Sequence, residues 1–286
     1  MTSITHTISE IQKLTRQAIA DGRPIVLIPT MGALHEGHLS LVDTAYSLEL
    51  DNPFVVMSIF VNPLQFAAGE DLDSYPRTLD ADAAKLAAHN HQVHAIFAPS
   101  PAEMYPLGPR TTITPGAAAL RFEGATRPTH FAGVLTVVNK LFQITQCQHA
   151  IFGEKDFQQL ALIRQMVADF NLPVHVHGSP LMRDHDGVAL SSRNAYLSDT
   201  ERIEARRISA ALRQAAMFHV KHDIIAAATN AMAGMDIDYI DVVAPDFSEP
   251  TAGNELYGNA RIITAVKVGN TRLLDNMAVN VEKPNA

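Results

Sequence analysis

Short apolar runs alternate with longer amphipathic segments between residues 25 and 176. Five runs are short and apolar enough to be buried strands: 25–28, 54–60, 94–97, 150–152 and 174–176. Apolar residues recur at helical spacing in four longer segments: 36–50, 79–90, 131–145 and 157–170. Because strands that alternate with helices form parallel sheets, this pattern predicts an α/β fold with helices on both faces of the sheet.

The pattern changes after about Leu181. Two helix-like segments, 200–220 and 223–233, precede three strand-like runs at 237–243, 261–268 and 271–275. Gly269-Asn270, between the last two runs, is typical of a tight hairpin turn. We therefore expect two domains: a Rossmann-like parallel-sheet domain over residues 1–181 and a smaller α+β domain over residues 182–286.

Composition and charge narrow the class of protein. The 286 residues are 47% hydrophobic, which suits a folded, soluble protein with a real core. A net charge of −8 disfavours non-specific binding of nucleic acid, which requires a basic face. The single cysteine, Cys147, excludes an internal disulfide and suits a reducing compartment. Without a secretory leader pattern or an apolar run near the roughly 18 residues of a membrane span, we expect a cytoplasmic protein.

The turn after the first predicted strand carries the strongest chemical signal. It reads Met31-Gly32-Ala33-Leu34-His35-Glu36-Gly37-His38 and leads directly into a predicted helix. Unpaired N–H groups and the positive dipole end attract phosphate to a helix start, and Gly32 lets the backbone approach a ligand. His35 and His38 can donate to a phosphate whose charge grows in a transition state. Two histidines near a helix start are often only surface residues, but the strand–turn–helix context favours a nucleotide-phosphate site.

Two further segments combine charged and hydroxyl side chains. One is Gly153-Glu154-Lys155-Asp156, which opens a helix, so that Lys155 offers a point charge for phosphate. The other is Leu190-Ser191-Ser192-Arg193, whose hydroxyls and guanidinium can wrap a triphosphate. Each is also consistent with a solvated loop. Ligands of parallel-sheet folds bind at the carboxyl ends of strands, where several of these turns lie, and this favours a shared site.

Amides and carboxylates form the remaining candidates. Asn62 and Gln65 follow the second predicted strand, and Gln159 follows Lys155 in the next helix. Amides suit a hydroxyl or carboxylate of a small substrate, although each could be a surface amide. Asp82 ends an acidic stretch that could hold Mg²⁺ together with phosphate oxygens, or could be a solvated loop and helix start. No zinc spacing and no P-loop pattern occurs.

Taken in order, these segments resemble the pantothenate synthetase (pantoate–β-alanine ligase) family over nearly the whole chain, from Pro29–His38 to the run 271–276. His35-Glu36-Gly37-His38 is also similar to the HIGH signature of class I aminoacyl-tRNA synthetases and nucleotidyltransferases. The resemblance implies a homodimeric ligase that depends on ATP and Mg²⁺. In it, the pantoate carboxylate attacks the α-phosphate of ATP, and β-alanine then converts pantoyl adenylate to pantothenate and AMP.

The resemblance also implies a role for each matching residue. His38, His35, Lys155 and Arg193 would be catalytic, and Gln65, Gln159 and Asn62 would bind the small substrate. The ATP contacts would come from residues 31–38 and 153–156, from Met182 and from residues 190–193, with the second domain closing over the nucleotide. Two other classes remain open on the residues alone: a nucleotidyltransferase that keeps AMP in its product, and a non-catalytic nucleotide-binding regulator.

Overall fold

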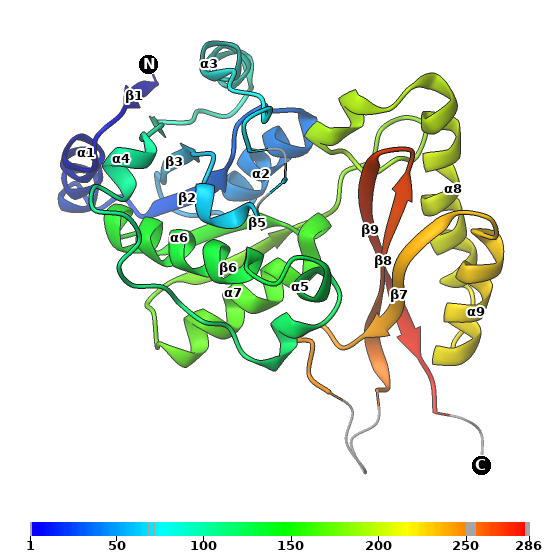
Figure 1. Cartoon of the computed structure of the whole chain (residues 1–286). Helices are drawn as coiled ribbons and strands as arrows, with labels where there is room; N and C mark the ends of the chain where they lie inside the picture. Colours follow the sequence, from blue (N-terminus) through cyan, green and yellow to red (C-terminus); the bar gives the residue numbers. More distant parts are fainter. Residues whose placement is uncertain (1, 68, 71, 250–255, 284–286) are drawn as a thin grey trace. The chain divides into compact units, whose positions relative to one another are not determined.

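The computed structural model describes residues 2–67, 69–70, 72–249 and 256–283. The chain divides into two compact units, each with its own sheet. The first unit consists of Met1–Glu154 with Leu162–Ser179, and the second of Lys155–Ala161 with Pro180–Ala286 (Figure 1). The predicted class, an α/β parallel sheet followed by a smaller α+β region, is confirmed.

The sheet of the first unit has six strands in the order β1-β4-β3-β2-β5-β6. Every neighbouring pair is parallel. The five predicted strands are confirmed with small changes at their ends, and β1 is an additional edge strand. The bounds are β1 Ser3–Thr5, β2 Ile25–Thr30, β3 Phe54–Ile59, β4 Ala95–Phe97, β5 His149–Gly153 and β6 His175–Ser179.

Helices connect these strands and cover both faces of the sheet. Helix α2 packs through Leu41 and Val42 in one cluster with Val26 and Ile28 of β2. The alternate residues of that strand, Ile25 and Leu27, are also completely buried. Since successive side chains of a strand point to opposite faces, both faces of β2 are covered, as the unbroken apolar run predicts.

Of the helices between residues 8 and 169, α2, α3, α6 and α7 were predicted, whereas α1, α4 and α5 were not; η3 and the start of α7 cross from the first unit into the second. Short 3-10 helices, η1 to η3, occupy several of the connections. The bounds are α1 Ile8–Ala20, α2 Glu36–Ser47, η1 Pro63–Gln65, α3 Leu79–Ala88, α4 Pro101–Met104, η2 Ala117–Leu120, α5 Glu123–Thr126, α6 His130–Thr145, η3 Glu154–Asp156 and α7 Phe157–Asp169.

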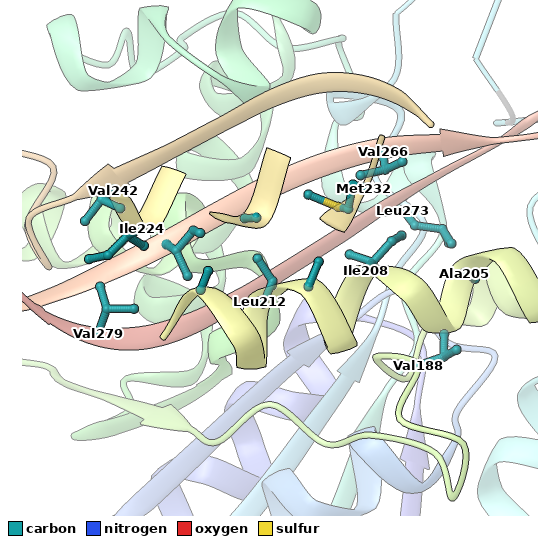
Figure 2. Packing of buried hydrophobic residues seen from close by; sticks show 14 of the residues in the cluster. Val188, Ala205, Ile208, Leu212, Ile224, Met232, Val242, Val266, Leu273 and Val279 are labelled. Carbon is teal, nitrogen blue, oxygen red and sulfur yellow. The ribbon is translucent and has the colours of Figure 1, made fainter. Parts of the chain in front are cut away.

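The second unit packs two helices against a three-stranded antiparallel sheet of order β7-β8-β9. Ile208 and Leu212 of α8 lie among the buried side chains of this sheet (Figure 2). The predicted Gly269 turn joins β8 to β9, and its φ of +56° explains the glycine. The bounds are η4 Ser192–Tyr196, α8 Asp199–Ala215, α9 Lys221–Ala231, β7 Asp236–Val243, β8 Gly258–Val268 and β9 Thr271–Val281.

Two further observations concern the described helices and the single cysteine. None of the described helices is long and apolar enough to cross a bilayer. Cys147 is a free, buried thiol, and burial raises its pKa to about 12. A thiol in that state is a poor nucleophile, so Cys147 serves as a core residue.

Candidate functional site

The turn between β2 and α2 has an unusual backbone. Gly32 has φ +85° and Ala33 has φ +50°, so two consecutive residues lie in the left-handed region. At Gly32 a side chain is disfavoured for a second reason: a Cβ there would lie only 3.0 Å from Cγ2 of Ile59 and 3.2 Å from Oδ2 of Asp82. The glycine expected to let backbone approach a ligand is therefore also required by the turn itself.

His35 and His38 cap the start of α2 reciprocally. The backbone N–H of Gly37 donates to Nδ1 of His35 at 3.1 Å, and the backbone N–H of His35 donates to Nδ1 of His38 at 3.3 Å. The two ring centroids are 4.1 Å apart. Because each Nδ1 accepts a hydrogen bond from a backbone N–H group, the neutral rings carry their proton on Nε2. The caps thus make Nε2 the hydrogen-bond donor of both histidines.

Asn62 and Gln65 lie on the short η1 segment that follows β3. Asn62 is completely buried, and its Nδ2 donates to Oε1 of Gln65 at 3.0 Å and to the carbonyl oxygen of Gly133 at 3.1 Å. Its Oδ1 accepts from the backbone N–H of Leu64 at 3.3 Å. Asn62 therefore orients Gln65, and with Oε1 engaged, the Gln65 side chain presents its Nε2 as a donor. Direct contact of Asn62 with substrate stays a prediction.

The backbone of Gln65 is held from the side of α5 and α6. Its carbonyl oxygen accepts from Nη2 of Arg127 at 3.1 Å and lies 2.9 Å from Nδ1 of His130. Arg127 is itself fixed by an ion pair of 2.6 Å with Glu70. The sequence patterns did not assign roles to Arg127 or His130, because a capping loop explains these residues equally well. Their tie to Gln65 is visible only in the fold.

Asp82 of α3 binds the backbone of the β2–α2 turn. It is completely buried, and its oxygens accept from the backbone N–H groups of Ala33 at 3.0 Å and Leu34 at 2.8 Å. Thr78 donates a third hydrogen bond to the same carboxylate. No group of three or more His, Cys, Asp or Glu side chains within the described part of the chain could hold a metal ion. The donor set therefore does not fit a protein-held Mg²⁺ at Asp82.

Lys155 lies on η3 and belongs to the second unit. Its Nζ is 3.7 Å from Oδ1 of Asp156, and its backbone carbonyl accepts a hydrogen bond from Asn276 of β9. The neighbouring Asp275 forms a two-point ion pair with Arg183 at 2.7 and 2.8 Å. Strand β9 thus fixes both Lys155 and the start of the loop that leads to Arg193.

That loop, residues 182–193, is tied to itself and to α8. The backbone N–H of Leu190 donates to the carbonyl oxygen of Met182 at 3.0 Å. Ser191 is the N-cap residue of η4, and its Oγ accepts from the backbone N–H of Arg193 at 3.3 Å. Near the middle of the loop, Asp186 pairs with Arg202 of α8 at 2.7 Å, and this arginine holds the pKa of Asp186 well below its usual range.

The predicted site residues fall into two sets. Strands β3, β2 and β5 are neighbours, so the segments that follow them emerge at one edge of the sheet, as predicted. This first set contains residues 31–38, Asn62, Gln65, Gly153 and Glu154, and the second unit holds Lys155, Asp156, Gln159, Met182 and residues 190–193. Gln159 is half-buried near the start of α7.

Comparisons with known proteins identify the family of this chain. The pantoate-β-alanine ligase family model matches residues 3–278. The chain is 97% identical to the pantothenate synthetase of Corynebacterium diphtheriae over the full length of both proteins. Among solved structures, the pantothenate synthetase of Thermus thermophilus has a TM-score of 0.87 at 40% identity, covering 96% of this chain and 98% of that one. The pantoate-β-alanine ligase of Francisella tularensis, complexed with β-γ ATP and β-alanine, has a TM-score of 0.79 at 36% identity, covering 97% of each chain. The chain therefore belongs to the pantoate–β-alanine ligase family.

Proposed function

We propose that this chain condenses pantoate with β-alanine to give pantothenate, using ATP through a pantoyl-adenylate intermediate. The observation that carries the proposal is the β2–α2 turn, where backbone caps make Nε2 of His35 and His38 the donor atoms. Such donors at a helix start suit the phosphates of ATP. The Francisella relative, whose structure is described with β-γ ATP and β-alanine, supports the same pair of substrates.

In the first step a carboxylate oxygen of pantoate attacks the α-phosphorus of ATP. The new O–P bond forms as the P–O bond to pyrophosphate breaks, and no proton needs to move. Two anions meet in this step, so donors aimed at the phosphates lower its barrier. We assign this task to His35 and His38 in the first unit and to Lys155 and Arg193 in the second, which closes over the nucleotide.

In the second step the amine of β-alanine attacks the acyl carbon of the adenylate. A C–N bond forms, the C–O bond to AMP breaks, and the amine loses a proton. We assign the binding of pantoate to Gln65 and Gln159. The Nε2 donor of Gln65 suits a carboxylate or hydroxyl oxygen, and the bonds from Asn62, Arg127 and His130 hold that amide in place.

Mg²⁺ enters in this proposal with ATP, bound by phosphate oxygens, because the described side chains do not form a cage for it. We count His35-Glu36-Gly37-His38 as a variant of the HIGH motif. We also propose a homodimer, from the family resemblance, that works in the cytoplasm. The single buried cysteine is consistent with a reducing compartment.

Pyrophosphate exchange tests the proposal. Labelled pyrophosphate is expected to enter ATP when enzyme, MgATP and pantoate are present and β-alanine is absent. Omitting pantoate should abolish the exchange, and His38→Ala should depress it by roughly 10²-fold, the cost of removing one such donor. Exchange without pantoate would favour the nucleotidyltransferase alternative, and exchange that requires β-alanine would contradict the proposed order.

A further inference from the structure

Two side chains of helix α3, Asp82 and Lys85, form hydrogen bonds with the backbone of the β2–α2 turn. They lie about one helical turn apart. Asp82 accepts the backbone N–H groups of Ala33 and Leu34, as described above. Lys85 donates from Nζ to the carbonyl oxygen of Leu34. Both the donors and the acceptor of one peptide segment are therefore satisfied by a single helix. The hydrogen bond from Leu34 to Asp82 joins residues that are 48 positions apart in the sequence.

The turn needs such support because of its own conformation. Gly32 and Ala33 both have positive φ, and for Ala33 this conformation carries a steric penalty from its Cβ. A strained backbone persists only where its surroundings impose it. A carboxylate that accepts two N–H groups forms strong, directional bonds, and Asp82 is completely buried, so water does not compete for them.

We propose that Asp82, assisted by Lys85, is a positioning residue that holds the turn over residues 32–34 in its phosphate-binding conformation, and that it is not a ligand of Mg²⁺. The inference rests on the proposed function, because it takes this turn to be part of the ATP site. Burial and three donors leave the carboxylate of Asp82 without an oxygen directed to solvent. A Mg²⁺ ligand, by contrast, has to offer one oxygen to the ion.

Asp82→Asn tests the proposal, with Asp80→Asn as its matched control. In Asp82→Asn one carboxylate oxygen becomes an NH₂ group, which faces a backbone N–H group and cannot accept from it. Asp80 lies on the same helix but is exposed, so Asp80→Asn makes the same chemical change away from the turn. We expect the amides of Ala33 and Leu34 to exchange with deuterium faster in free Asp82→Asn than in wild type, and to be unchanged in Asp80→Asn. We also expect pantoate-dependent pyrophosphate exchange to fall by about 10²-fold, the loss caused by small misplacement of reacting groups.

A magnesium titration separates positioning from metal binding. The Mg²⁺ concentration that gives half-maximal exchange should be the same in Asp82→Asn as in wild type. A rate that returns to the wild-type value at high Mg²⁺ would overturn the proposal and make Asp82 a metal ligand. Wild-type rates at all Mg²⁺ concentrations would overturn it as well.

Lys85→Met provides a second variant if Asp82→Asn fails to fold. It keeps the aliphatic stem and removes only the donor to Leu34, so a loss in the same direction but smaller, about tenfold, is expected. No change in exchange rate or in the protection of Leu34 would count against the proposal. If wild-type enzyme shows no pantoate-dependent exchange at all, the proposed function fails, while the amide-protection result still decides whether Asp82 holds the turn.

Discussion

The side-chain Nδ2 of Asn276 donates a hydrogen bond of 2.9 Å to the backbone carbonyl oxygen of Lys155. The two residues are 121 positions apart, and the bond links β9 to the first turn before α7. Asn276 is buried, so water cannot replace its amide as the donor. Strand β9 thus fixes the backbone at Lys155, from which the side chain with the ammonium group extends.

Asn276→Ala should therefore slow adenylate formation. Losing one hydrogen bond costs about 1 kcal/mol, and we expect a roughly fivefold lower rate of pyrophosphate exchange. The reaction of preformed pantoyl adenylate with β-alanine should change little. Asn280→Ala, on an exposed position of the same strand, is the control. Equal losses in both half-reactions would mean that Asn276 only supports the fold.

Lys155→Ala removes the charge itself and should act more strongly on the same step. Its ammonium opposes the negative charge that gathers as the carboxylate meets ATP, so we expect about 10²–10³-fold slower adenylation. Rapid-quench measurement of adenylate and of amide formation separates the two steps, with Lys267→Ala on the exposed face of β8 as a control. A defect confined to amide formation would contradict the role proposed for Lys155.

Gln65→Ala should weaken the binding of pantoate and leave that of ATP nearly unchanged. The variant leaves a substrate oxygen unsatisfied, at about 1–3 kcal/mol. Steady-state KM values for pantoate and ATP test this, with ATP as the internal control. Gln159→Ala should act in the same direction. A rise in the KM for ATP alone would place either glutamine on the nucleotide.

Stability should fall as the solution is acidified through the titration of His94. Burial, aided by the Arg23 guanidinium beside the ring, lowers the pKa of His94 to about 4, whereas an unfolded histidine titrates near 6.5. The unfolded state therefore binds an extra proton between these values. The contribution of His94 is complete above about pH 6.5 and is lost as pH falls toward about 4, by at most about 1.4 kcal/mol per pH unit.

Urea unfolding at several pH values in this window checks the effect of His94. His94→Gln should show a shallower dependence of the free energy of unfolding on pH than wild type. His222→Gln, at a strongly exposed position, serves as the control and should keep the wild-type slope. Parallel curves for His94→Gln and wild type would exclude a titrating role for His94.

The sheet, most helices and the histidine turn could be predicted because their signals are local. The unbroken apolar run of β2 and the Gly269 turn each report on neighbouring residues only. Helix α1 was missed although Thr7 and Glu10 form a capping box at its start, because its buried stripe is thin and includes Thr15 and Ala18. The capping-box residues Thr7 and Glu10 are the sequence signal that predicts the start of this helix.

The side chains that hold the site's backbone in place, Asp82 and Arg127, could not be predicted in the same way. Asp82 reads as an acidic residue at a helix start, which is equally consistent with a metal ligand or a solvated side chain. Only the fold brings it to the backbone of Ala33 and Leu34, and only the fold brings Arg127 to Gln65. Such contacts depend on how elements far apart in sequence meet, and periodicity carries no information about that.

Gly133 of helix α6 limits how far Gln65, the residue proposed to bind pantoate, can move relative to that helix. A Cβ at this position would lie 2.1 Å from the carbonyl oxygen of Leu64, so η1 rests on the bare backbone of the helix. No side-chain rotamer lies between them to yield under thermal agitation. The backbone of Gln65 should therefore move together with α6, and the distance between η1 and this helix should change little with temperature or hydrostatic pressure.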